Sequence, residues 1–284
     1  MIDTVFQGKT GILGTYLITG DRTALIDPGP PVQATQVLEI LKQLGVKINL
    51  IALTHIHLDH AAGTWDILQE HSKCKVIVHP RGSKHLVDPT NLLEAALSQF
   101  KGEMPPYGEV NPVPHEVITE SEEGMILDLG DTKLLVIWTS GHSTHSQSFF
   151  EPENGLLFTG DAAGQIVFDQ VIPASPPPFN PEQTIESIEH MINLKPTIIC
   201  ISHFGYRENA VSYLSDFRDR VELWKRLSFE AIENGGGLRD LFELVHSNDK
   251  IIKKLIELHP EAKSDIYSSL VGFISYAKWK NNQK

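Results

Sequence analysis

Four side chains that commonly bind metal ions lie within one short stretch, Thr54-His55-Ile56-His57-Leu58-Asp59-His60. The apolar, β-branched run at 48–53 comes directly before it and predicts a buried strand. Because alternate side chains of an extended segment point the same way, His55 and His57 can bind one ion. Asp59 and His60 follow where the chain turns and can reach a second ion. Imidazole and carboxylate ligands suit zinc, iron or manganese, so the stretch predicts a metal site at a strand end.

Three further apolar strands are each followed by one residue of the same kind. A single histidine near a strand end is more often an ordinary core or surface residue. Repetition of the pattern at four strand ends favours a metal centre instead. The three further pairs are 133–138 with His142, 155–159 with Asp161, and 197–201 with His203.

With these residues the chain resembles the metallo-β-lactamase superfamily of metallohydrolases, whose pattern is HxHxDH followed by a lone His, an Asp and a His. An N-terminal signature of the family also matches, at 15–18 and 24–29. The resemblance covers about residues 1–208 and implies an α+β fold, the four-layer αββα metallo-β-lactamase sandwich. We therefore expect a catalytic domain at 1–208, followed by a C-terminal helical extension at 209–284.

The resemblance also implies two divalent metal ions per chain, with zinc, iron and manganese all open. One ion would be held by His55, His57 and His142; the other would be held by Asp59, His60 and His203; and Asp161 would bridge the two. A water held between two such ions loses a proton near neutral pH and becomes a bridging hydroxide nucleophile. Asp161 and Asp59 are thus the candidate catalytic residues, and for Asp59 a proton-shuttle role is open beside the ligand role.

Three more residues are candidates for the surroundings of the ions. Asp27 resembles the family's buried acid that orients ligand histidines, and the equal alternative is an aspartate that caps the turn before Pro28. His145 either reaches the cleft, or contacts the ligand residues without binding an ion, or lies at the surface. Tyr206 either walls the pocket or packs as a core aromatic residue.

The implied activity is that of a dinuclear metal-dependent hydrolase that cleaves an ester-type bond of a small molecule: a thioester, lactone, carboxylic ester or phosphodiester. The helical extension is similar to the layout of glyoxalase II, but 162–165 lacks the Gly/Arg-rich stretch of that branch. Gly164 stands where quorum-quenching lactonases carry a tyrosine. Two alternatives are a mononuclear-iron, persulfide dioxygenase-like oxidoreductase and a non-catalytic metal-binding protein. Metal count and oxygen uptake would separate the dinuclear hydrolase from the dioxygenase-like alternative.

The composition limits which classes of partner and which cellular location are expected. The formal net charge of −12 opposes nucleic-acid binding, which depends on Lys and Arg side chains. There is no run of eighteen apolar residues and no signal-peptide pattern, so neither a membrane span nor export is expected. Both cysteines lie in apolar stretches and are expected to be buried thiols, which favours a cytoplasmic location.

The remaining elements follow from periodicity and turn residues. The sequence predicts a hairpin at 16–26, a strand at 75–78, and helices at 33–44, 64–70, 92–100 and 182–194. The segment 81–116 is either part of a lid or a surface excursion. After Tyr206 only helical patterns continue, at 214–233, 238–245, 249–258 and 264–279.

The first tail helix carries an apolar stripe that must be covered. We expect the tail to cover the core near the active-site mouth, either alone or with an added homodimer contact. The residues of the stripe are Leu214, Phe217, Val221, Trp224 and Leu227.

Overall fold

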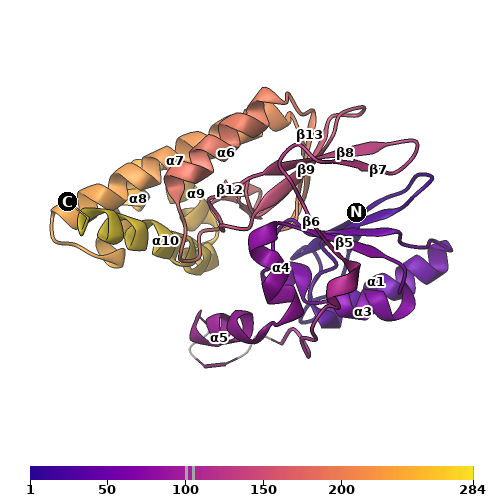
Figure 1. Ribbon diagram of the computed structural model, residues 1–284. Helices are drawn as coiled ribbons and strands as arrows, with labels where there is room; N and C mark the ends of the chain where they lie inside the picture. The colour runs from indigo at the N-terminus through magenta and orange to yellow at the C-terminus, as the bar shows by residue number, and fades with distance from the viewer. Residues whose placement is uncertain (100–101, 104–105, 284) are drawn as a thin grey trace. The chain divides into compact units, whose positions relative to one another are not determined.

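The structure is a computed structural model that describes residues 1–99, 102–103 and 106–283 (Figure 1). Two compact units make up the chain. Unit 1 comprises 1–138, 145–160 and 199–206; unit 2 comprises 139–144, 161–198 and 207–284. His142 and Asp161 therefore belong to unit 2, and the other five expected ligands belong to unit 1. The domain boundary expected after residue 208 stays a prediction.

The first sheet of unit 1 has the strand order β1-β2-β3-β4-β5-β6. The predicted hairpin is confirmed, since β2 and β3 pair antiparallel. From β3 to β6 the strands pair parallel, so their carboxyl ends meet at one edge, where α/β folds place ligands. The strands are β1 Ile2–Asp3, β2 Gly14–Ile18, β3 Ala24–Ile26, β4 Leu50–Ala52, β5 Lys75–Val78 and β6 Ile118–Glu120.

The second sheet has the order β14-β13-β10-β9-β8-β7. Its edge strand β14 was not expected, because the polar sequence Gly-Tyr-Arg-Glu carries no apolar alternation. Such polarity is common in edge strands, which it protects from further pairing. The strands are β7 Ile126–Asp128, β8 Lys133–Trp138, β9 Gln147–Glu151, β10 Leu156–Gly160, β13 Ile198–Ile201 and β14 Gly205–Glu208.

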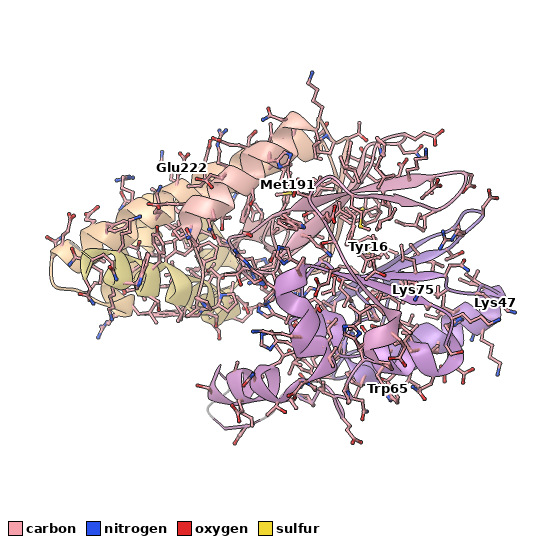
Figure 2. The ribbon with its side chains drawn as sticks, in the orientation of Figure 1. Tyr16, Lys47, Trp65, Lys75, Met191 and Glu222 are labelled. Carbon is pink, nitrogen blue, oxygen red and sulfur yellow. The ribbon has the colours of Figure 1, made fainter. Side chains whose placement is uncertain are left out.

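Tyr16 of β2 connects the two sheets (Figure 2). Its ring meets Phe158 of β10 edge-on, with centroids 5.3 Å apart. Its hydroxyl group lies 2.8 Å from the carbonyl oxygen of Ile201 and 2.6 Å from that of Gly205. The buried ring of Tyr16 thus adds apolar surface to the contact between the sheets, while its hydroxyl group stays hydrogen-bonded.

Helices α1 and α3 lie side by side in unit 1 (Figure 1). Pro31 in the first turn of α1 and a left-handed Gly45 at its C-terminus explain its limits. The helix α4 was not predicted, because its sequence holds Gly82 and little apolar periodicity. A Cβ atom at Gly82 would come within 2.8 Å of Ile56, so the glycine permits close packing there. The helices are α1 Pro31–Leu44, α2 Leu58–Ala61, α3 Thr64–Glu70, α4 Pro80–Val87 and α5 Thr90–Gln99.

The expected lid segment is described only in part. Its predicted helix corresponds to α5, while Phe100, Met104 and Pro105 lie outside the described residues. Tyr107 accepts a hydrogen bond from the backbone of Val32 at 3.1 Å, which ties the end of the segment to α1. The lid role stays a prediction.

Unit 2 combines a β-hairpin with helices. The apolar stripe of α7 is buried, as predicted, and α7 contacts both α6 and α10 (Figure 1). The position of the tail relative to the metal ligands stays a prediction. In the part of the chain that the structure describes, none of the helices combines the length and the apolar character that a membrane span needs. The elements are β11 Gln165–Val167, β12 Gln170–Ile172, α6 Pro181–Asn193, α7 Ala210–Glu233, α8 Leu238–Asn248, α9 Lys250–Leu258 and α10 Lys263–Asn281.

Candidate metal centre

The ligand-rich stretch comprises the connection between β4 and α2 and the first three residues of α2, and we call it the ligand loop (residues 53–60). His55 and His57 precede the helix, and His57 is the residue before its first turn. Asp59 and His60 lie within α2 itself. The expected turn after His57 is therefore a short helix, which presents Asp59 and His60 from neighbouring positions.

Asp59, His60 and His203 form one cluster in unit 1. The Nε2 atoms of His60 and His203 lie 3.3 Å apart. The Oδ2 atom of Asp59 is 3.3 Å from Nε2 of His203 and 3.7 Å from Nε2 of His60. Two ligand atoms each about 2.05 Å from a tetrahedral ion would be separated by about 3.3 Å. The three donor atoms thus have the spacing of ligands to one ion.

His55 and His57 form a second pair in the same unit. Nε2 of His55 lies 3.1 Å from Nδ1 of His57, again close to the separation that a shared ion requires. His145 lies beside this pair, with ring centroids 6.4 Å from His55 and 5.7 Å from His57. His145 therefore borders the ligand loop.

Hydrogen bonds at Nδ1 orient the imidazoles of the candidate ligands. Nδ1 of His60 lies 3.0 Å from Oδ2 of Asp27, and Nδ1 of His203 lies 3.2 Å from the carbonyl oxygen of Ile12. Both acceptors require a proton on Nδ1. The Nε2 lone pair of each ring is then available for a metal ion.

His55 is held in the same way through Thr54. Its Nδ1 lies 3.0 Å from the Thr54 hydroxyl oxygen. That hydroxyl donates its proton to Asp27 Oδ2 at 2.6 Å, so it can accept from the imidazole. The Nε2 atom of His55 is thereby left as the ligand atom.

Asp27 is the common anchor of these contacts. It is 2% exposed and its backbone is left-handed, with φ 49°. Its Oδ1 atom accepts from the backbone N–H of Thr54 at 2.8 Å, and its Oδ2 atom is 3.3 Å from the Ser202 hydroxyl. These contacts fit the role of orienting ligand histidines better than the role of a turn cap alone.

Unit 2 holds a third set of ligand-type atoms. Nε2 of His142 lies 3.6 Å from Oδ2 of Asp161. Nδ1 of His142 donates to the carbonyl oxygen of Ala174 at 2.7 Å, so Nε2 again carries the lone pair. Gly141 precedes His142 with φ 139°, and a Cβ atom there would overlap Thr184 of α6.

The histidines affect the ionisation of Asp59. Burial by itself raises the pKa of this carboxyl group, but the charge of His60 and the hydrogen bond and charge of His203 outweigh it. The pKa of Asp59 therefore lies well below its ordinary value. The carboxylate form, which is the form that binds metal ions, is favoured in the fold.

Tyr206 lies in β14 with 56% of its surface exposed. It is not a buried core aromatic residue, and its expected place in a pocket wall stays a prediction.

Asp27 was among the residues considered for orienting the imidazoles, but the other groups that hold them were not found from the sequence. The carbonyl groups of Ile12 and Ala174 carry no sequence signal, because every residue has a carbonyl group. Thr54 could have been noticed, since it precedes His55 directly and has a hydroxyl group that can reach a neighbouring ring.

The sequence profile described as "Metallo-beta-lactamase superfamily" matches residues 14–203. This chain belongs to the metallo-β-lactamase superfamily. ST1585 of Sulfurisphaera tokodaii is 32% identical over 163 residues, which is 56% of this chain and 61% of ST1585. "Probable metallo-hydrolase MJ0888" of Methanocaldococcus jannaschii is 33% identical over 148 residues, or 52% of this chain and 65% of that protein. The chain thus spans somewhat less than two thirds of the length of these relatives.

Solved structures of superfamily members have the same fold. TTHA1429 of Thermus thermophilus aligns with a TM-score of 0.65 over 97% of this chain and 91% of its own, at 19% identity. TTHA1623, solved in a di-iron-bound form, aligns with a TM-score of 0.56 over 71% of this chain and 94% of its own, at 24% identity. The expected metallo-β-lactamase fold with a C-terminal helical extension is confirmed. At the level of the superfamily, the relatives and the His/Asp clusters support a metal-dependent hydrolase.

Proposed function

We propose that this superfamily member hydrolyses an ester-type bond of a small molecule with the help of two divalent metal ions. The substrate class is a thioester, lactone, carboxylic ester or phosphodiester. The observation that carries the proposal is the arrangement of the His60 and His203 rings in unit 1. The Nδ1 atom of each ring is hydrogen-bonded to an acceptor, and the two Nε2 atoms lie 3.3 Å apart. The di-iron form of TTHA1623 supports two ions and makes iron a candidate beside zinc and manganese.

The family pattern provides the proposed ligand assignment. In this proposal one ion takes His55, His57 and His142, the other takes Asp59, His60 and His203, and Asp161 bridges them. Bound divalent ions lower the pKa of water and stabilise negative charge that develops on a substrate.

The chain's own residues prepare this chemistry in three ways. Asp59 is held as a carboxylate by its histidine neighbours. Asp27 and the Ile12 carbonyl group hold a proton on Nδ1 of His60 and His203, so that Nε2 of each ring is the nitrogen left to bind a metal ion. Asp161 offers an anion beside His142, and two cations close together need such an anion between them.

Elemental analysis of full-length protein purified without added metal tests the proposal, together with a panel of the four ester-type substrates. About two ions per chain with turnover of at least one substrate class is the expected result. One iron per chain with oxygen uptake would favour the dioxygenase-like alternative. Bound metal without turnover of any class would favour a non-catalytic metal-binding protein.

The variant Asp161→Ala tests the bridging role. We expect hydrolysis to be abolished and the metal content to fall from about two ions towards one, because the only proposed anion between the ions is removed. Asp169→Ala is the matched control, since Asp169 is 92% exposed and pairs with Arg207 at 3.2 Å. Unchanged turnover and metal content in Asp161→Ala would refute the bridging role.

A further inference from the structure

Gln147 is a fully buried amide at the start of β9 in unit 1. A buried amide costs free energy unless its groups are hydrogen-bonded, so its presence in a strand core calls for a reason. The metal-ligand assignment does not use it, and its neighbours in β9 include the apolar residues Phe149 and Phe150.

The contacts of Gln147 converge on the residues directly before His55. Its side-chain Nε2 donates to the carbonyl oxygen of Leu53 at 2.7 Å, and its backbone N–H donates to the carbonyl oxygen of Thr54 at 2.8 Å. One residue of the second sheet therefore holds two consecutive peptide groups at the start of the ligand loop.

Asp27 holds the same peptide segment from the other side. It accepts from the backbone N–H and from the hydroxyl group of Thr54. The residue before His55 is thus fixed by Asp27 of the first sheet's edge and by Gln147 of the second sheet. Together these contacts leave His55 little freedom to shift.

The amide of Gln147 is itself fixed. Its Oε1 atom accepts from the hydroxyl group of Ser121 at 2.5 Å, and the Ser121 hydroxyl oxygen in turn accepts from the indole N–H of Trp138 at 3.2 Å. Ser121 directly follows β6, so it comes from the same sheet edge as the ligand loop. Because the oxygen end of the amide is occupied, its nitrogen end must face Leu53.

We propose that Gln147, fixed by Ser121, is a positioning residue for the metal centre. It holds the start of the ligand loop so that the His55–His57 pair keeps the spacing that a metal ion requires. Ligand distances in metal sites stay within about 0.2 Å of their usual values, so a loop that no longer holds His55 in place is expected to lose metal affinity. The inference rests on the proposed metal-dependent function.

A matched pair of variants tests the inference, Gln147→Met and Glu151→Met. Glu151 ends the same strand, is 2% exposed, and accepts from the backbone N–H groups of Glu153 and Asn154 at 2.9 Å each. Both changes remove a buried polar group and keep a similar side-chain length. We expect both variants to unfold at lower urea concentration, while only Gln147→Met binds zinc more weakly, by about tenfold.

The measurement is the zinc dissociation constant of the full-length protein, obtained by competition with a chromophoric chelator. Ser121→Ala is the second variant and tests the positioning role if Gln147→Met does not fold. It removes the hydrogen bond that fixes the Gln147 amide but keeps the amide itself. We expect a smaller but measurable loss of zinc affinity, of about threefold. Equal zinc affinity in Gln147→Met and Glu151→Met, or wild-type affinity in Ser121→Ala, would overturn the positioning role. A wild-type protein that binds no zinc, iron or manganese would instead refute the proposed function.

Discussion

The single carboxylate of Asp27 positions several residues of the candidate metal centre. Its two oxygens meet donors from Thr54, His60 and Ser202. All of these partners are donors, so the site needs a group that only accepts hydrogen bonds. A carboxylate meets that need, whereas an amide of the same shape would point its NH2 group at another donor.

Replacing this residue in Asp27→Asn is expected to lower metal affinity by about 10–100-fold, because His60 loses the acceptor that fixes its tautomer. Chelator competition on the full-length protein measures the loss. Asp128→Asn is the control, since Asp128 is an exposed residue at the end of β7 that accepts from the N–H of Gly130 at 2.9 Å. If Asp27→Asn bound metal as tightly as the control, Asp27 would not orient the ligands.

His79 makes stability depend on pH. Burial lowers its pKa to about 4, and its Nδ1 atom accepts from the N–H of Arg81 at 3.1 Å, which requires an unprotonated nitrogen. Between about pH 4 and the ordinary value of 6.5, the unfolded chain binds more protons than the fold. The stability contributed by neutral His79 is complete above pH 6.5 and is lost as pH falls to about 4.

The variant His79→Asn keeps a good cap for α4 but cannot titrate. We expect its free energy of unfolding to fall less than that of the wild type between about pH 7 and about pH 4.5, by at most about 3 kcal/mol. Urea unfolding of both metal-free proteins at the two pH values measures the difference. An identical pH dependence in the two proteins would show that His79 is not the group responsible.

The helices of unit 2 are held by close backbone packing and by one buried ion pair. Asp249 caps α9 and also lies 3.0 Å from Nε of Arg220 on α7, so it connects the two helices. Gly272 of α10 brings that helix against the carbonyl oxygen of Ser175, and the ring of Phe179 lies tilted against that of Phe273 with centroids 4.8 Å apart. The tail helices therefore pack on the segment that precedes α6.

Gly272→Ala is expected to destabilise the protein, although alanine usually stabilises a helix relative to glycine. An alanine in a helix interior is normally about 1 kcal/mol more stable than glycine. Here the added Cβ atom would overlap the Ser175 carbonyl group and lie 2.6 Å from Cβ of Phe179, so we expect a loss of about 1–3 kcal/mol. Ser268→Ala, on an exposed position of the same helix, should change stability by less than about 0.5 kcal/mol. Chemical denaturation compares the two variants, and a stabilised Gly272→Ala protein would contradict the packing.

At the scale of the whole molecule, the tail is part of a larger unit. Unit 2 combines residues 207–284 with 161–198, and the buried stripe of α7 includes Leu214 and Trp224. In α6, Ile188 and Met191 are fully buried. Removing the tail would expose apolar surface on α6 to water, at a cost of about 25 cal/mol for each Å².

Deletion of residues 209–284 is therefore expected to give an insoluble or inactive protein. Solubility, size-exclusion behaviour and metal content of the truncated and full-length chains provide the measurement. A soluble truncated protein with two metal ions and full activity on the same substrates would instead show that the tail is an independent appendage.

The sequence by itself determined the types and order of the candidate ligands and most of the elements that carry them. Helix α3 and strand β5 were predicted at their observed bounds, because apolar spacing and turn residues act locally. The superfamily and its fold were expected from a resemblance, which rests on the HxHxDH motif, on the later His142, Asp161 and His203, and on the N-terminal signature.

Only the tertiary structure decided which atoms orient those ligands. The acceptors for His60 and His203 come from Asp27 and Ile12, which are 33 and 191 residues away, and carbonyl acceptors have no residue-type signal. In the same way, Gln147 reaches Leu53 across 94 residues. Local patterns in a sequence specify elements because neighbouring residues interact, whereas contacts between distant peptide groups exist only once the sheets have packed.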